Sequence, residues 1–545
     1  MKSLSLNTTL ERLVIAGILG AQFAFTPGLV TDPYATPKLL IQTAISLSIL
    51  FITLAEAYKR FTKYKIILVI LLAFVLQGLL VFILADSIIY QQFYGTYGRN
   101  TGFLSYLGYI FYLLGLLLIS SYNFLRKIVL TIKFAGLISF VYGLAQYFKL
   151  VSIDNLTQKN EAVNGFFGNI NFQSSFLGIA AIFFFIDLFT ENKKSTKLAS
   201  VFIVLLFLLE INLSTSQQGN FVFLAGVTVV FFLKILTMRN AKYILTPYLI
   251  LVFTFTSGII LGILNKGPLA RFIYEASIKA RGDYWAAGWK MTTLHPWFGV
   301  GFDGYGDWYR RTRTLGSISD FGVNDYSNAA HNVFLDISSS GGFPLLLIYL
   351  ILVIYTLFSA IRVLKRSREF NAPFVAIFAG WVAYQVQSLI SINQLGLAIW
   401  GWVLTGLIIG YEINTRVDQE QSSPLAGVRG LKTKALSGFL VGTVIAVVPF
   451  YASFKMQKGF DSADVQKLRT ASVNWPFEIK TMIDSAEIFR TNGYNDISLE
   501  IARLAVDKFP QYFDAWYLLS IQPNATLEEK DTSLNQLKRL NPKIF

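Results

Sequence analysis

The chain has 545 residues, of which 54% are hydrophobic and only 14% are charged. Soluble proteins carry about a quarter charged residues, so this composition excludes an ordinary soluble enzyme, and its high hydrophobicity excludes a disordered chain. The absence of cysteine excludes disulfides, thiolate metal sites and a cysteine nucleophile, and the presence of only two histidines argues against a histidine-based metal centre. The net charge of +15 indicates nucleic-acid binding only if it gathers on one surface, so its position along the chain has to be found first.

Long apolar segments predict an all-α protein that crosses a membrane many times. About 20 apolar residues are needed to cross the hydrocarbon core, and only a helix satisfies its own backbone there. Thirteen segments meet this requirement: 12–30, 39–57, 66–85, 103–121, 127–148, 172–190, 198–213, 220–237, 243–264, 343–361, 372–392, 395–411 and 436–454. The sequence therefore predicts a polytopic transmembrane helical bundle of about 12–13 spans.

Basic residues predict which side of the membrane each loop faces. If the N-terminus is cytoplasmic, the six short loops on the cytoplasmic side carry twenty Lys and Arg residues. The five short loops on the other side carry four, namely Lys38, Arg99, Lys149 and Lys159. We therefore expect a cytoplasmic N-terminus. The net positive charge is then mainly a consequence of membrane topology, and no nucleic-acid partner is expected.

This topology predicts four parts. Spans 1–9 occupy residues 1–264, a long extracytoplasmic loop covers 265–342, spans 10–13 occupy 343–454, and an extracytoplasmic tail covers 455–545. The side on which the tail lies depends on the span count, because the loss of one short span would move it to the cytoplasm.

The tail has the pattern of helical repeats. Trp475-Pro476, Phe509-Pro510 and Asn541-Pro542 recur at spacings of 34 and 32 residues, with amphipathic stretches between them. A period of about 34 residues with paired helices resembles tetratricopeptide repeats. Two partial repeats are few for an independent stack, so we expect the tail to dock on the membrane domain. It would serve either as an arm for a protein partner or substrate, or as a structural cap.

The long loop contains three motifs. The segment Leu269–Thr293, which includes Arg281 and Trp285, has helical spacing and an aromatic stripe suited to a membrane interface. A turn-rich stretch, Pro296–Gly301, follows. Residues 299–304 match G-x-G-x-x-G, but this does not indicate a dinucleotide site, because that site requires a βαβ unit. The third motif is His331-Asn332, with Gly341-Gly342 before the next span.

Together these motifs resemble the large periplasmic loop of the O-antigen ligase family, which includes O-antigen ligases, O-antigen polymerases and bacterial O-linked oligosaccharyltransferases. Arg99-Asn100-Thr101-Gly102, and the N-x-N element Asn169-Ile170-Asn171, are weaker matches upstream. The resemblance covers about residues 10–410. Family members often carry Ser-Arg-Gly at one span junction, where this chain has Ser216-Gln217-Gln218-Gly219. An anion-binding arginine is therefore expected to be missing there.

The resemblance implies an enzyme of the bacterial cytoplasmic membrane that transfers a glycan from undecaprenyl pyrophosphate to an acceptor hydroxyl outside the cytoplasm. The acceptor stays open among lipid A core, a glycan end and a protein. His331 is expected to act as the base and Arg281 to stabilise the leaving group. The expected substrate-binding residues are Arg99, Asn332, Arg313, Glu210, Gln218 and Asn171. No metal or other cofactor is expected, since no cluster of carboxylates suggests a divalent cation.

Structural explanations stay open for the same residues. His331 could be an ordinary loop histidine, and Arg99 could anchor at lipid headgroups. Asn332 could cap the following helix, with Asp336 facing solvent. Glu210 lies inside a span, where a carboxylate suggests a functional role, and we expect it to pair with a loop arginine.

Two other functions compete with the transferase. A transporter or flippase of lipid-linked or anionic substrates should show repeated halves and charged residues at the middle of the membrane, and the sequence shows neither convincingly. A membrane anchor that displays a repeat-based binding arm would leave the arginine and histidine motifs of the loop unexplained.

Overall fold

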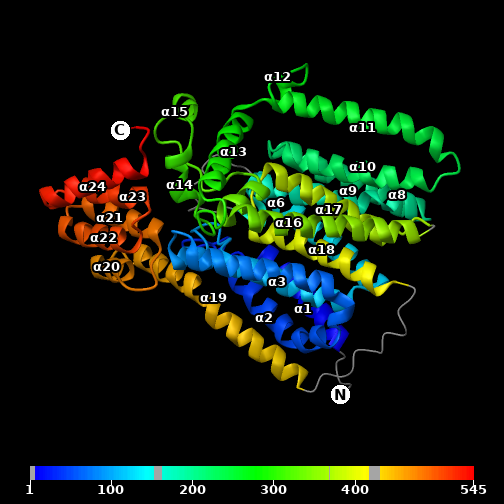
Figure 1. Cartoon of the computed structure of the whole chain (residues 1–545), viewed down its shortest axis with the longest axis horizontal. Coiled ribbons are helices and arrows are strands. Elements are labelled where there is room, and N and C mark those ends of the chain that lie inside the picture. Colours follow the sequence, from blue (N-terminus) through cyan, green and yellow to red (C-terminus); the bar gives the residue numbers. More distant parts are fainter. Residues whose placement is uncertain (1–5, 152–162, 368, 417–429, 545) are drawn as a thin grey trace.

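The computed structural model describes residues 6–151, 163–367, 369–416 and 430–544, and every regular element in those ranges is a helix (Figure 1). The predicted all-α membrane bundle is thereby confirmed. Lys159, which was counted among the basic residues of the loops, lies outside the described residues, as do two of the twenty basic residues assigned to the cytoplasmic side, Arg368 and Arg429.

Each of the thirteen apolar segments overlaps a helix, although the first, 12–30, extends seven residues beyond a helix that ends at Phe23. Eleven helices in the described residues are long and apolar enough to cross a membrane. They are α2 (Thr36–Lys59), α3 (Phe61–Leu84), α6 (Tyr122–Tyr147), α7 (Ile170–Phe185) with its continuation α8 (Asp187–Thr190), α9 (Lys194–Leu213), α10 (Gln218–Leu236), α11 (Ala241–Ile263), α16 (Val333–Arg366), α17 (Ala372–Ile390), α18 (Leu395–Asn414) and α19 (Leu431–Asp461). The remaining two segments form α1 (Leu6–Phe23) and the shorter apolar helix α5 (Phe103–Ile119).

The bundle has buried helices at its centre and apolar helices exposed at its periphery. The apolar length of α18 is completely buried, whereas that of α11 is not buried at all and lies at one edge of the molecule (Figure 1). At the other edge α19 packs along α2. A side chain at Gly438 or Gly442 would collide with the α2 backbone, so these glycines, four residues apart, allow the two helices to approach closely.

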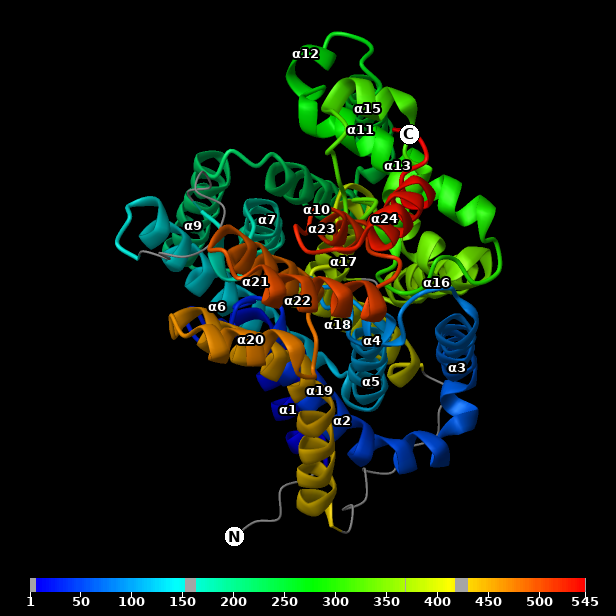
Figure 2. The same cartoon turned by 90° about the vertical axis from the view of Figure 1, so that its left-hand side faces the viewer.

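The hydrophilic regions gather at one end of the bundle, where Figure 2 shows them facing the viewer. The long loop forms α12 (Ala270–Ile273), α13 (Ala276–Leu294), α14 (Tyr305–Thr312) and α15 (Leu315–Phe321). Shorter connections form α4 (Ile89–Tyr94) and the 3-10 helix η1 (Gly165–Phe167). The tail, which continues from α19, forms α20 (Val465–Val473), α21 (Ile479–Thr491), α22 (Asn495–Lys508), α23 (Phe513–Ser520) and α24 (Leu527–Leu540).

The small number of repeats predicts that the tail docks on the membrane domain. It contacts that domain where Gln511 donates a hydrogen bond of 3.3 Å to Asp86, just after α3, and it also docks on the long loop. Arg310 on α14 forms an ion pair with Asp514 on α23, with 3.2 Å between the charged atoms. Arg311 donates a hydrogen bond of 2.6 Å to Gln511. The long loop and the tail therefore lie on the same side of the membrane. Helices α21 to α24 coincide with the predicted amphipathic stretches; their assignment as tetratricopeptide repeats stays a prediction.

Candidate functional site

An open cavity of about 450 Å³ lies at the end of the bundle that carries the loop and the tail. Asn171 at the start of α7, Arg281 on α13 and His331 just before α16 all line it. Three residues that the sequence motifs place far apart in the chain are thus brought to one cavity. Tyr284, Tyr326 and Asn328 complete much of the remaining wall.

His331 is held at the cavity by an unusual backbone conformation. Its φ of 54° is left-handed, which places the ring immediately before the N-terminus of α16. Its Nδ1 lies 3.3 Å from the carbonyl oxygen of Ala329. Because a carbonyl can only accept, Nδ1 carries the proton in this contact and Nε2 keeps its lone pair. The ring also lies against Tyr284, with 5.3 Å between the ring centroids.

The environment of His331 favours its neutral form. Burial, followed by the positive charges of Arg281 and Arg99, lowers the pKa of His331 to about 4. At neutral pH the imidazole is therefore uncharged and able to accept a proton.

Asn332 positions its neighbour and does not line the cavity. Its side-chain oxygen accepts hydrogen bonds from the N–H groups of Phe334 at 3.0 Å and Leu335 at 3.2 Å, which is the capping arrangement considered from the sequence. Its side-chain nitrogen donates to the carbonyl of Leu389, which joins the start of α16 to the end of α17. Both ends of the amide are thus occupied by backbone, and this fixes the chain directly after His331.

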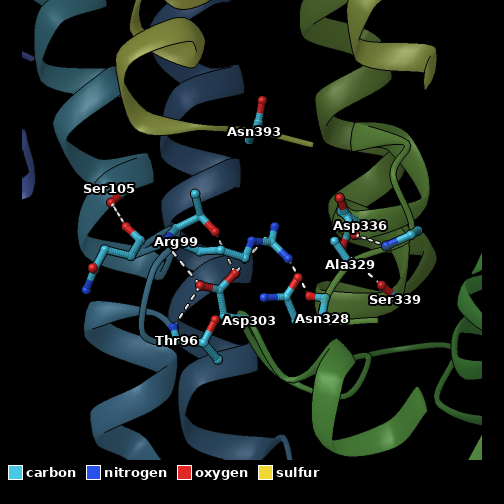
Figure 3. Close-up of polar contacts among 12 residues, drawn as sticks. Thr96, Arg99, Ser105, Asp303, Asn328, Ala329, Asp336, Ser339 and Asn393 are labelled. Atoms are coloured by element: carbon cyan, nitrogen blue, oxygen red, sulfur yellow. Dashed lines mark hydrogen bonds and ion pairs between the residues drawn. The ribbon is translucent and has the colours of Figure 1, made fainter. Parts of the chain in front are cut away.

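The expectation that Asp336 faces solvent is wrong. Its carboxylate turns inward and accepts a hydrogen bond of 2.7 Å from the N–H of Ala330 (Figure 3). Its second oxygen is buried and has no hydrogen-bond partner. Asp336 therefore fixes the residue before His331, much as Asn332 fixes the backbone after it.

Arg281 reaches the cavity from α13. Its Nε donates to the carbonyl of Ile390 at 3.1 Å, and one Nη1 hydrogen donates to Ser277 at 3.0 Å. The first bond holds the guanidinium against the end of α17, and the second ties it to the backbone of its own helix. Since the group has five N–H donors, others are available to an anion in the cavity.

Arg99 belongs to a buried cluster beside the cavity. Its guanidinium lies 3.9 Å from a carboxylate oxygen of Asp303 and donates to the carbonyl of Asn328, a residue of the cavity wall (Figure 3). Asp303 in turn accepts from the N–H of Thr96 at 3.0 Å and from the hydroxyl of Thr101 at 2.7 Å. Arg99 is thus fixed by protein groups inside the molecule, where it acts on His331 through its charge.

Asp303 was not singled out by the sequence analysis. The sequence signal that could have found it is an acidic residue two positions after the glycine-rich turn Pro296–Gly301. In the structure its φ of 52° is left-handed. It ties the loop that carries Arg99 to that turn, so it is a positioning residue for the cluster.

Five of the six predicted substrate-binding residues do not line the cavity: Arg99 and Asn332, described above, and Arg313, Glu210 and Gln218. Arg313 is completely buried and donates to the carbonyls of Val323 and Asp325 and to the side chain of Asn541. Arg313 therefore links the long loop to the tail and is not positioned to bind an anion in the cavity.

Glu210 and Gln218 contact side chains of α7. The expected pairing of Glu210 with a loop arginine is wrong, because its carboxylate accepts a hydrogen bond of 2.9 Å from Gln173 on α7. The side-chain oxygen of Gln218 lies 3.5 Å from the hydroxyl of Ser175, and its side-chain nitrogen is buried without a partner.

The Pro296–Gly301 turn packs on a kink in α16. The N–H groups of Val300 and Gly301 donate to the carbonyls of Ser339 and Ser340 at 2.7 and 3.0 Å. Gly342 has φ 71° and ψ −174°, a conformation essentially restricted to glycine, and a side chain there would meet the backbone of Pro296 and Trp297. The glycines of this motif therefore serve close backbone packing, which positions α13 and His331 relative to each other.

Gly342→Ala is expected to destabilise the protein by about 1–3 kcal/mol from backbone strain, with further loss from the collision. Thermal unfolding of the purified protein in detergent measures this as a lower Tm. Gly282→Ala is the matched control, since Gly282 lies in α13 with open space around it. An unchanged Tm for Gly342→Ala would contradict the packing role.

Residues 171–350 match the family model described as O-antigen ligase. This range includes Asn171, Arg281 and His331, and it ends within α16. No curated protein matches the chain.

Proposed function

We propose that this chain, which carries an O-antigen ligase domain at residues 171–350, transfers a glycan from undecaprenyl pyrophosphate to an acceptor hydroxyl. The domain is that of a membrane glycosyltransferase family, and the chain is a multi-pass membrane protein. In this proposal the chain lies in the bacterial cytoplasmic membrane with a cytoplasmic N-terminus, and the cavity opens on the outer side.

The observation that carries the proposal is the meeting of His331 and Arg281 at one open cavity. In the proposed step the acceptor oxygen attacks the anomeric carbon of the donor sugar, and the bond from that carbon to the pyrophosphate oxygen breaks. Nε2 of His331 takes the proton of the acceptor hydroxyl. The bonding electron pair leaves with undecaprenyl pyrophosphate, whose negative charge is stabilised by Arg281 and, at longer range, by Arg99.

The low pKa of His331 is compatible with this role. Burial, with the positive charges of Arg281 and Arg99, lowers the pKa of His331 and keeps the imidazole neutral before the donor binds. When the anionic pyrophosphate approaches the same arginines, it offsets their charge and raises the proton affinity of the ring. His331 thus becomes a stronger base when substrate is present.

The pH dependence of kcat/KM follows from this electrostatic arrangement. His331 loses its lone pair below its pKa, so the acid limb of the profile is expected near pH 4 instead of near the ordinary histidine value of about 6.5. Arg281→Gln removes a nearby positive charge and should move that limb to higher pH, even though the rate also falls. An acid limb near 6.5 in wild type, or one that stays in place in the variant, would contradict the assignment.

Reconstitution tests the function directly. Purified protein in liposomes is given the undecaprenyl-pyrophosphate glycan with lipid A core, a free glycan end or a Ser/Thr-containing peptide as the acceptor. We expect transfer to one of the three. We also expect transfer to persist with a metal chelator, since arginine charge supplies the leaving-group stabilisation in this mechanism. Loss of transfer on chelation would contradict that part of the proposal.

A further inference from the structure

A second, larger cavity of about 750 Å³ lies between the tail and the outer loops of the bundle. Its walls come from the length of α21, from α23, from α4 and the loop after it, and from the second half of α19. Most of its lining residues, including those of the tail helices, lie outside the matched range 171–350; Tyr326 and Asn328 lie inside it. Figure 2 shows α21 and α22 crossing the end of the bundle in front of α4 and α18.

The lining of this cavity combines aromatic rings with paired charges. Its aromatic residues are Tyr90, Tyr97, Tyr326, Phe477, Phe509, Tyr512 and Tyr517. Three carboxylates in the lining each have a cationic partner: Asp484 pairs with Lys480, Glu487 with Arg490, and Asp514 with Arg310.

A fourth carboxylate, Glu478, is also compensated. It accepts hydrogen bonds from the N–H groups of Lys480 at 2.8 Å and Thr481 at 2.7 Å. Burial raises the pKa of Glu478 to about 7, so part of the population is uncharged at neutral pH. The cavity therefore offers many ring faces and hydrogen-bonding groups but little uncompensated charge, which disfavours a phosphate or a strongly basic peptide.

The two cavities adjoin. Tyr326 and Asn328 line both of them, and Arg99 donates to the carbonyl of Asn328 at this boundary. A chain-like ligand that occupies the larger cavity could therefore place its end beside His331.

From these features we propose that the larger cavity binds a neutral saccharide chain and leads its end to the catalytic cavity. Sugar rings present apolar C–H faces that stack on aromatic side chains and hydroxyls that hydrogen bond to paired polar groups, which is the chemistry of this lining. The inference rests on the proposed glycan transfer. The saccharide is either the acceptor glycan or the glycan of the lipid-linked donor, and these two sources share the same chemistry.

The test uses Tyr517→Ala in the full chain. Tyr517 is 53% exposed and lines the cavity, so its removal should leave the fold intact. Tyr494→Ala is the matched control, since Tyr494 is 46% exposed on the tail and does not line the cavity. The probe is the oligosaccharide released by mild acid from the undecaprenyl-pyrophosphate glycan, and its binding is measured by saturation-transfer NMR and fluorescence titration.

We expect Tyr517→Ala to raise the Kd of the oligosaccharide by about 3- to 10-fold, the effect of losing one aromatic stacking contact, with little change in the control. In transfer assays with Tyr517→Ala, a raised KM for the donor would show that the cavity binds the donor glycan, and a raised KM for the acceptor would show that it binds the acceptor glycan. Equal binding of the oligosaccharide by wild type and Tyr517→Ala would overturn the inference. So would a result in which binding of a Ser/Thr peptide depends on Tyr517 while binding of the oligosaccharide does not. If saccharide binding depends on Tyr517 but no transfer is detected, the result would support saccharide binding in this cavity and contradict the proposed transfer reaction.

Discussion

Replacing His331 with alanine is expected to lower the rate of glycan transfer by about 10²–10⁴-fold, which is the usual contribution of a general base. The physical reason is that, among the described residues of the cavity wall, no other side chain offers a neutral nitrogen lone pair, since the others are an arginine, two asparagines, two tyrosines, two serines and an alanine. The measurement is single-turnover transfer in liposomes, where the chemical step is separated from substrate binding.

His295→Ala is the matched control for this prediction. His295 packs its ring against Trp308, with 4.5 Å between the centroids, and does not line the cavity. We expect this variant to transfer at nearly the wild-type rate. Equal losses in the two histidine variants would indicate a general loss of fold and would contradict the specific role of His331.

Arg281→Ala is expected to lower transfer by about 10²–10³-fold, because the developing charge on the pyrophosphate loses a fixed donor in a partly buried site. Arg281→Lys keeps the charge but not the planar fork, so an intermediate rate is expected. The same single-turnover assay measures both.

Arg271→Ala provides the control for the arginine series. Arg271 is exposed on the short helix α12, where it stacks on Phe272, and it does not line the cavity. Transfer at the wild-type rate is expected there. A rate for Arg281→Ala equal to that of Arg271→Ala would remove Arg281 from the mechanism.

Much of the fold could be predicted because the membrane imposes strong rules on sequence. Apolar length alone located thirteen helices, and the scarcity of repeats in the tail predicted its docking. The start of α16 was missed: its first turns, from Val333 to the kink at Gly342, contain Asp336 and three serines, so they lack the hydropathy of a span. They form a helix because Asn332 caps them and Gly342 redirects the chain into the apolar part.

The candidate site was predictable only in part. The motifs pointed to His331, Arg281 and Asn171, which the structure brings to one cavity. The motif that contains Arg99 gave no information about its partner, since Asp303 lies far along the chain and only tertiary packing brings them together. For Arg313 and Glu210 the sequence suggested ligand binding, but the structure gives them protein partners. Arg313 donates to Asn541, and Glu210 accepts from Gln173.

The measurement that tests the central claim most directly is the stoichiometry of transfer by purified protein in liposomes. Mass spectrometry of the lipid fraction would follow undecaprenyl pyrophosphate while the glycosylated acceptor is counted. One undecaprenyl pyrophosphate released per glycan transferred is expected for the wild type, and no release above background for the double variant His331→Ala/Arg281→Ala. No transfer by the wild type to any of the three acceptor classes, or undiminished transfer by the double variant, would contradict the account.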